Sequence, residues 1–142
     1  MGQHADYGRM LLAAIAKEHF TSDRQFTRVE YLGNTSAFID GVIRPDCAVE
    51  VESRVDKQVR GALVDLLSHS YPKKLLVLIP AHMNDPKKTK EQCEGILNKF
   101  KRPTDQAMVV VLKGTGDNRE PKEDEKLLRA ALSKLDIVQS KP

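Results

Sequence analysis

The apolar residues of this chain recur with two different spacings. In four ranges they stand three or four positions apart, which is the period of an amphipathic helix. The helices predicted in this way cover residues 6–20, 55–69, 86–100 and 123–135. In the first of these ranges, Glu18 falls on or beside the apolar stripe formed with Met10, Leu11, Ala14 and Ile15, which is an unusual place for an acid.

The remaining apolar residues predict strands. Residues 25–32 alternate between apolar and polar, as in a strand with one wet face, and residues 33–34 form a turn signal. Residues 37–53 hold two apolar runs around Arg44, Pro45 and Asp46, which predicts a β-hairpin. Residues 74–80 and 107–112 are continuous apolar runs, typical of parallel strands that are buried on both faces and reached through helical crossovers.

The order of these elements is α-β-β-β-α-β-α-β-α. An antiparallel meander is followed by units in which a helix leads into a parallel strand. This order predicts an α/β fold with a sheet of mixed direction and helices on both of its faces.

Three acids fall in the predicted hairpin. Side chains alternate along a strand, so Val49 and Val51 point to one face while Glu50 and Glu52 point to the other. If the hairpin pairs around the proline turn, Asp40 on its first strand comes to lie near both glutamates. The sequence therefore predicts three carboxylates close together in the middle of a sheet.

Two interpretations explain these carboxylates. They lie on a solvated strand face with lysine partners, or they surround a hard divalent cation, because neighbouring like charges raise one another's pKa and a buried unpaired carboxylate is strongly disfavoured. The elements around the hairpin favour the second interpretation. A helix with an acid on its stripe precedes the hairpin, and a crossover helix and a doubly buried strand follow it.

Composition adds limits to this picture. The 142 residues suffice for one domain, predicted over 1–142, with 40% hydrophobic and 30% charged residues. A net charge of +3 permits a nucleic-acid partner without requiring one. Cys47 and Cys93 lack metal-ligand spacing and are predicted to be reduced thiols of a cytoplasmic protein. No apolar run approaches the ~20 residues that span a bilayer, so no membrane segment is expected.

The acids and the order of the elements together resemble the PD-(D/E)XK nuclease superfamily, which has the restriction-endonuclease-like fold. Members share an αβββαβ core, with one acid on the second strand and a (D/E)-x-K element on the third. Asp40 and the run Glu50-Val51-Glu52 match these positions, and the resemblance covers about residues 6–80. The chain departs from the pattern at Ile39, which replaces a proline, and at Glu52, which replaces the lysine. Some restriction endonucleases of the superfamily carry this E-x-E form.

The resemblance implies a metal-dependent DNA endonuclease that hydrolyses phosphodiester bonds, with Mg²⁺ as cofactor and Mn²⁺ as a substitute. Asp40, Glu50 and the main-chain carbonyl of Val51 are then the expected metal ligands. Glu52 is expected to hold a second ion or to orient the attacking water. Glu18 is expected to bind the metal through water, as the acid that family members often carry on the first helix.

Partners and alternatives follow from the same resemblance. The expected partners are DNA and a second copy of the chain, since cutting both strands of a duplex needs two sites. Candidate phosphate contacts are Lys57, Arg54, Lys73, Lys74 and His82, whereas the histidines at 4, 19, 69 and 82 show no zinc spacing and suggest surface residues. The alternatives are a Holliday-junction resolvase-type nuclease, a catalytically inactive nucleic-acid-binding module of the same fold, and an unrelated α/β protein whose carboxylates face solvent.

Overall fold

The structure is a computed structural model that describes residues 2–31 and 35–141 of the chain. Its helices are α1 (Gln3–Ala16), η1 (Lys17–His19), α2 (Arg24–Thr27), α3 (Lys57–Ser68), η2 (Pro80–His82), α4 (Pro86–Phe100) and α5 (Pro121–Lys134). Its strands are β1 (Phe20–Thr21), β2 (Arg28–Glu30), β3 (Ser36–Phe38), β4 (Gly41–Ile43), β5 (Cys47–Glu52), β6 (Lys73–Leu78) and β7 (Gln106–Val111). None of the helices in these described ranges is long and apolar enough to cross a membrane.

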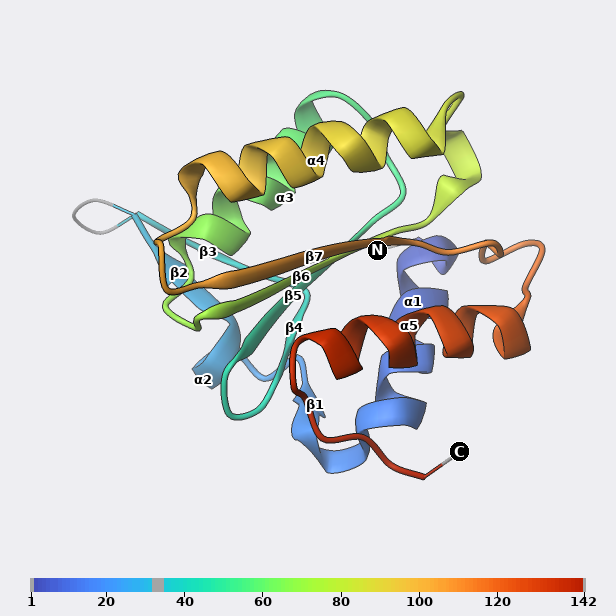
Figure 1. Cartoon of the computed structure of the whole chain (residues 1–142), viewed down its shortest axis with the longest axis horizontal. Helices are drawn as coiled ribbons and strands as arrows, with labels where there is room; N and C mark the ends of the chain where they lie inside the picture. The colour runs from blue at the N-terminus through green and yellow to red at the C-terminus, as the bar shows by residue number, and fades with distance from the viewer. Residues whose placement is uncertain (1, 32–34, 142) are drawn as a thin grey trace.

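Five strands form a mixed sheet in the order β1-β4-β5-β6-β7. The pairs β1–β4 and β4–β5 are antiparallel, whereas β5, β6 and β7 run parallel to one another. Helices cover both faces of the sheet, with α1 and α5 on one side and α3 and α4 on the other (Figure 1). The predictions of an α/β fold with a mixed sheet, of the hairpin around Pro45 and of two parallel strands over the continuous apolar runs are confirmed. The predicted burial holds for β6, whereas β7 lies at the edge of the sheet and is buried at Val109 and Val110 but half-buried or exposed elsewhere.

The buried parallel strands divide the core into two halves. On β5 and β6 the side chains alternate, so that Val49, Val51 and Val77 pack against α1 and α5, while Ala48 and Leu76 pack against α3 and α4. All six residues of β5 are buried. Any polar side chain on this strand must therefore find its partners inside the protein or in a cavity.

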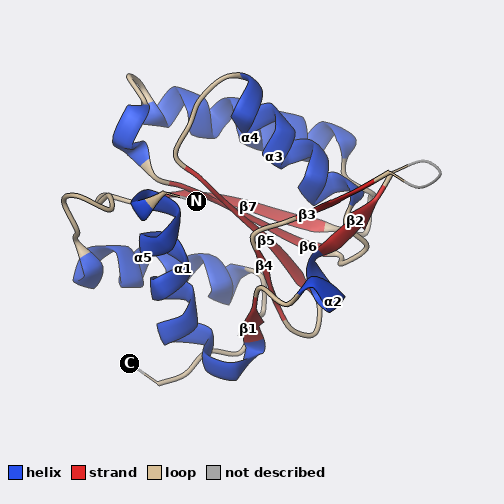
Figure 2. Cartoon of the chain, turned by 180° about the vertical axis from the view of Figure 1, so that it is seen from behind, coloured by secondary structure: helices blue, strands red, loops and turns tan. Residues whose placement is uncertain are grey.

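The prediction of a single strand over residues 25–32 is wrong. Residues Arg24–Thr27 form the short helix α2, because Asp23 caps it by accepting a hydrogen bond from the Gln25 N–H at 2.9 Å. Arg28–Glu30 then pairs with β3 in a separate two-stranded sheet, which branches from the end of β4 (Figure 2). The first strand of the main sheet is instead Phe20–Thr21. Leu32 and the turn signal at residues 33–34 lie outside the described residues.

The first helix differs from its prediction in its buried face and its end. Its buried residues include Tyr7, Leu11 and Ile15, whereas Met10 is 43% exposed. The α-helix stops at Ala16, and Lys17 takes a left-handed φ of 53°. The chain therefore changes direction before Glu18 can continue the helical stripe.

A glycine brings α1 close to the sheet. A Cβ atom on Gly8 would lie 2.7 Å from Cγ1 of Val51, closer than such atoms approach in proteins. Because no side chain separates them there, the first turns of α1 rest directly on the end of β5. This close approach places α1 residues beside the acids of that strand.

A buried carboxylate on α5 also binds the first turns of α1. Asp124 of α5 accepts hydrogen bonds from the Tyr7 hydroxyl at 2.6 Å and from the Lys113 and Gly114 N–H groups at 2.6 and 2.9 Å. The Tyr7 hydroxyl in turn accepts from the Glu120 N–H at 3.1 Å. The carboxylate therefore ties α1, α5 and the loop after β7 together.

Candidate functional site

The candidate site lies at the first residue of β4, beyond which β5 continues without it. The two strands pair from Ile43 opposite Cys47 to Gly41 opposite Val49, and there β4 stops. Ile39, two residues before β4, donates its N–H to the Thr27 carbonyl at 2.9 Å, so the chain at that point lies outside the main sheet. The last residues of β5 therefore have no strand beside them on the β4 side.

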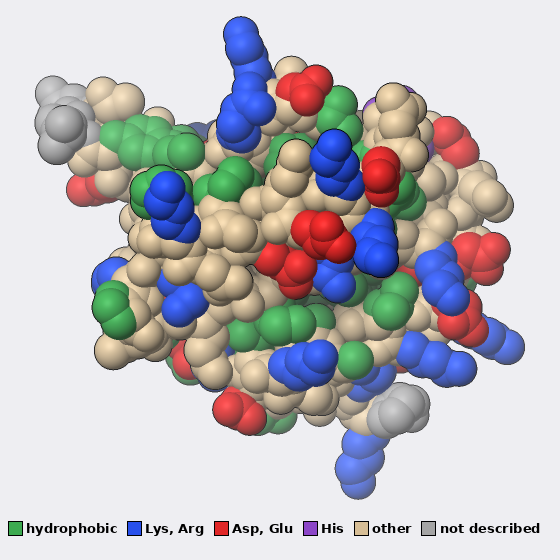
Figure 3. Space-filling view, turned by 45° about the horizontal axis from the view of Figure 1, so that its top comes forward, with side chains coloured by type: hydrophobic (Ala, Val, Ile, Leu, Met, Phe, Trp, Pro, Cys, Tyr) green, Lys and Arg blue, Asp and Glu red, His purple; other side chains and the backbone are tan. Residues whose placement is uncertain are grey.

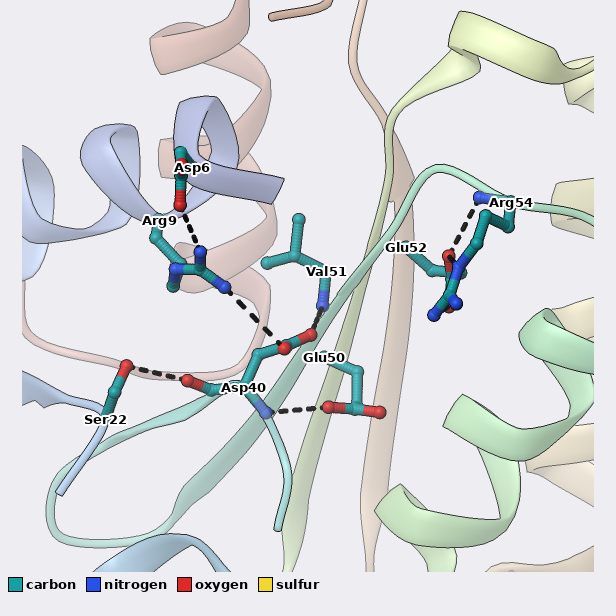
Figure 4. Close-up of polar contacts among 8 residues, drawn as sticks. All are labelled: Asp6, Arg9, Ser22, Asp40, Glu50, Val51, Glu52 and Arg54. Carbon is teal, nitrogen blue, oxygen red and sulfur yellow. Dashed lines mark hydrogen bonds and ion pairs between the residues drawn. The ribbon is translucent and has the colours of Figure 1, made fainter. Parts of the chain in front are cut away.

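The side chain of Asp40 fills the place that the strand leaves. Its Oδ2 atom accepts the Val51 N–H at 2.7 Å, which a backbone carbonyl would accept in a longer ladder. The backbone N–H of the same residue, Asp40, donates to Oε1 of Glu50 at 2.7 Å. Figure 4 shows the two carboxyl groups side by side at this fork. The prediction that Asp40 lies near Glu50 is confirmed, although Asp40 sits in the bend before β4.

Burial makes this acid pair hold a proton. Glu50 is 8% exposed, and burial raises the pKa of its carboxyl to about 9, with the neighbouring Asp40 carboxylate as the second cause. Burial also raises the pKa of Asp40, against the opposing effects of the Val51 N–H, the Glu50 hydrogen bond and Arg9. At neutral pH the raised pKa of Glu50 therefore favours the protonated form of its carboxyl.

An arginine from α1 faces Asp40. Arg9 approaches Oδ1 of Asp40 at 3.7 Å and also forms an ion pair with Asp6, one helical turn earlier (Figure 4). The side chains of Arg9 and Asp40 are each only 17% exposed, so water screens their attraction weakly. Arg9 thus acts against the effect of burial and favours the ionised form of Asp40.

Glu52 lies further along β5 and has its own partner. It is 5% exposed, and it accepts the Arg54 N–H at 2.8 Å and two guanidinium hydrogen bonds at 3.0 Å. The solvated-face interpretation with lysine partners is therefore wrong for both glutamates. The sequence position where the resemblance expects a lysine holds a buried carboxylate, and a cation two residues later compensates it.

The three acids line one cavity of about 490 Å³, which we call the acid cavity. Its other lining residues include His4 from α1 and His82 from η2, whose rings pack edge to face with centroids 5.5 Å apart. A hollow of about 560 Å³ between α3 and α4 is larger, but Asp56 is the one acid in its lining. The chemistry of the side chains, and not the size of the hollow, selects the acid cavity as the site.

The donor set of the acid pair fits a hard divalent cation. Asp40 and Glu50 offer carboxylate oxygens, and the Val51 carbonyl points to the same side of β5 as its N–H, which bonds Asp40. Within residues 2–31 and 35–141, no three His, Cys, Asp or Glu side chains form a group that could hold a metal. A cation there would thus have two carboxylate ligands and complete its shell with water and substrate oxygens, as Mg²⁺ commonly does.

The fourth predicted acid lies apart from this group. Glu18 stands in η1, its side chain is 81% exposed, and it pairs with His19 at 3.7 Å. The η1 segment lies beside the hairpin turn, where the Arg44 N–H donates to the His19 carbonyl, at the opposite end of β4 from Asp40. Because Glu18 does not line the acid cavity, the structure does not bring it to the site.

Two of the predicted phosphate contacts are also displaced. Lys74 is fully buried and donates to the His69 carbonyl at 2.5 Å, and burial lowers its pKa to about 8. Lys73 pairs with Asp46 at 3.2 Å beside the hairpin turn. His69, expected at the surface, is buried, and its ring contacts the Phe26 carbonyl. Of the five candidates, Arg54 and His82 line the acid cavity.

Residues that the sequence did not mark out complete the site. Arg9 and His4 lie on α1, far from the hairpin in sequence, and Asp65 of α3 reaches the cavity from the other face of the sheet. A basic residue one helical turn after Asp6 was a signal for Arg9, but nothing in its spacing pointed towards Asp40. Over the face that Figure 3 shows, Lys and Arg side chains are interspersed with acidic ones, so charge alone does not outline a nucleic-acid surface.

No protein-family model matches the chain, and neither a curated protein nor a solved structure matches it.

The proton on Glu50 predicts how stability depends on pH in the absence of metal. In the unfolded chain the carboxyl titrates near 4.5, and in the folded protein near 9. Between these values the folded state binds more protons, so the free energy of unfolding should fall as pH rises, by up to about 1.4 kcal/mol per pH unit. Urea unfolding in EDTA from pH 5.5 to 8.5 measures this slope. Glu50→Gln should flatten it, and an equal slope in that variant would contradict the assignment.

Proposed function

We propose that this protein is a metal-dependent endonuclease that hydrolyses phosphodiester bonds in DNA, with Mg²⁺ as its cofactor and Mn²⁺ as a substitute. The observation that carries the proposal is the pair of carboxylates at the fork between β4 and β5, where Asp40 accepts the Val51 N–H and Glu50 accepts the Asp40 N–H. A buried carboxyl that favours its proton, beside a half-buried second carboxyl, forms a place where a divalent cation can replace that proton.

The arrangement of the main sheet supports the same proposal. Taken in chain order, helix α1, the main-sheet strands β1, β4 and β5, helix α3 and strand β6 give a helix, three strands, a helix and a strand, with the short elements η1, α2, β2 and β3 lying between them. This is the αβββαβ order that the resemblance to the PD-(D/E)XK superfamily implies, with Asp40 beside the second strand and Glu50 on the third. The acid cavity also lies at the carboxyl ends of the parallel strands β5 and β6, where open α/β sheets commonly bind ligands.

Each residue at the acid cavity has a separate role in the proposed reaction. Asp40, Glu50 and the Val51 carbonyl hold the cation, which when bound supplies Lewis-acid stabilisation of the phosphate and a more acidic water. Arg9, 3.7 Å from Oδ1 of Asp40, favours the ionised form of that carboxyl. Arg54 neutralises Glu52, so that a phosphate can approach the acid cavity with less repulsion.

A catalytically inactive nucleic-acid-binding module of the same fold is the second candidate. It is favoured by the ion pairs of Arg9 with Asp40 and of Arg54 with Glu52, because these two arginines balance the acids without a metal. This candidate predicts DNA binding without cleavage. A Holliday-junction resolvase-type activity is a narrower form of the first proposal and predicts preference for branched DNA.

Thermal unfolding with divalent cations, followed by a plasmid-nicking assay, tests the proposal. Mg²⁺ or Mn²⁺ at millimolar concentration should raise Tm, and the rise should be larger at pH 8.5 than at pH 6.5, because the cation must displace the proton on Glu50. The protein should also nick supercoiled plasmid DNA in Mg²⁺ but not in EDTA. An unchanged Tm together with intact plasmid would refute the endonuclease, and linear, branched and single-stranded substrates then separate the subclasses.

A further inference from the structure

Most polar side chains that line the acid cavity already have hydrogen-bond partners within the protein. These side chains are His4, Asp40, Glu50, Glu52, Arg54 and Asp65. His82 differs from them. Across residues 2–31 and 35–141 no hydrogen bond reaches its ring nitrogens, and its ring contacts that of His4 edge to face. An exposed imidazole in this cavity therefore has both nitrogens open to a ligand.

The position of His82 is set by the sheet. It ends the short helix η2, which begins two residues after β6. Leu78, the last residue of β6, pairs in register with Glu52, and the Ile79 N–H donates to the Glu52 carbonyl at 2.9 Å. The chain therefore passes from the end of β6 to His82 directly beside the end of β5.

His4 holds the ring of His82 from one side. The Gly116 N–H donates to Nδ1 of His4 at 2.9 Å, so the proton of a neutral His4 is on Nε2. Nε2 of His4 lies 4.0 Å from the Asp117 carboxylate. Since the His4 ring is oriented by these two neighbours, it gives the ring of His82 a defined surface to pack against.

We propose that His82 is the general acid of the reaction and protonates the oxygen that leaves phosphorus. The inference rests on the proposed endonuclease activity. Water forms a new oxygen–phosphorus bond and releases a proton to solvent, while the bond from phosphorus to the ester oxygen breaks and its electron pair stays on that oxygen. The imidazolium of His82 gives its proton to this oxygen, becomes neutral and regains a proton from solvent. Histidine suits this task because its charge changes near neutral pH.

A comparison of two substrates tests the role. Cleavage of supercoiled plasmid DNA releases a sugar alkoxide, a leaving group that needs a proton. Hydrolysis of bis(p-nitrophenyl) phosphate releases a stable phenolate, a leaving group that does not. His82→Ala should slow Mg²⁺-dependent plasmid nicking about 100-fold, at the lower end of general-acid effects, and change hydrolysis of the p-nitrophenyl ester by less than threefold. His82→Asn, which donates a hydrogen bond but cannot give up a proton, should be as slow as His82→Ala on plasmid DNA.

His19→Ala is the matched control, because His19 is a partly exposed histidine outside the acid cavity. It should leave both rates unchanged, and His82→Ala should keep the rise in Tm that Mn²⁺ produces. Equal losses on both substrates, or activity restored by Asn, would overturn the general-acid role in favour of simple phosphate binding, and full activity of His82→Ala would overturn it outright. Where the wild type cleaves and Glu50→Gln does not, such results refute the role of His82 alone; a wild type inactive on both substrates refutes both proposals.

Discussion

Replacement of Glu50 by Gln should abolish Mg²⁺-dependent nicking of plasmid DNA while the protein stays folded. Gln keeps the shape of the side chain and can still accept the Asp40 N–H, which Glu50 accepts at 2.7 Å. It cannot carry the negative charge that holds a cation. The loss should be at least about 10²–10³-fold, the effect of removing one group that stabilises a transition state. The rate of nicking, measured beside the rise in Tm with Mn²⁺, checks both consequences.

Glu18→Gln is the matched control for this prediction. The resemblance assigns Glu18 to the site, but the structure places it in η1, exposed and outside the acid cavity. The control should therefore cleave DNA at the wild-type rate. A large loss in Glu18→Gln, or near-normal cleavage by Glu50→Gln, would contradict the placement of the metal at the fork between β4 and β5.

Replacement of Asp124 by Ala should cause the largest loss of stability outside the hydrophobic core. The carboxylate is fully buried and accepts hydrogen bonds from the Tyr7 hydroxyl and from the Lys113 and Gly114 N–H groups. Alanine would leave these donors without a partner. Since each buried unsatisfied donor costs about 1–3 kcal/mol, the free energy of unfolding should fall by about 3 kcal/mol or more. Urea unfolding at pH 7 measures this change, and Tm should fall by roughly 10 °C.

The neighbouring residue on α5 provides the control. Glu123 is half exposed and lies 3.6 Å from Lys113, so Glu123→Ala should cost less than about 1 kcal/mol. Asp124→Asn should fall between the two, because it keeps one acceptor oxygen but places an amide group among donors. Equal stability of Asp124→Ala and Glu123→Ala would show that the buried carboxylate does not tie α1, α5 and the loop after β7 together.

Local pattern was enough to determine much of this protein. Continuous apolar runs identified β6 and β7, and alternation on β5 showed that Glu50 and Glu52 leave the strand on the opposite side from Val49 and Val51. The turn at Pro45 fixed the register that brings Asp40 opposite Glu50. These features follow from period and turn chemistry, which depend on neighbours in sequence.

Only the tertiary structure decided what surrounds the acids. Gly8 allows α1 to rest on β5, and this contact brings Arg9 to Asp40 and His4 to the cavity, over distances in sequence that no periodic pattern reports. Glu18 lies outside the site for a similar reason. The helix α1 ends at Ala16 and the chain changes direction at Lys17, so Glu18 does not continue the apolar stripe of the helix. The sequence alone thus brought Asp40 and Glu50 together at the hairpin, whereas long-range packing determined that Arg9 faces Asp40 and that His4 and His82 line the same cavity. Burial and charge depend on groups that meet only when the chain folds.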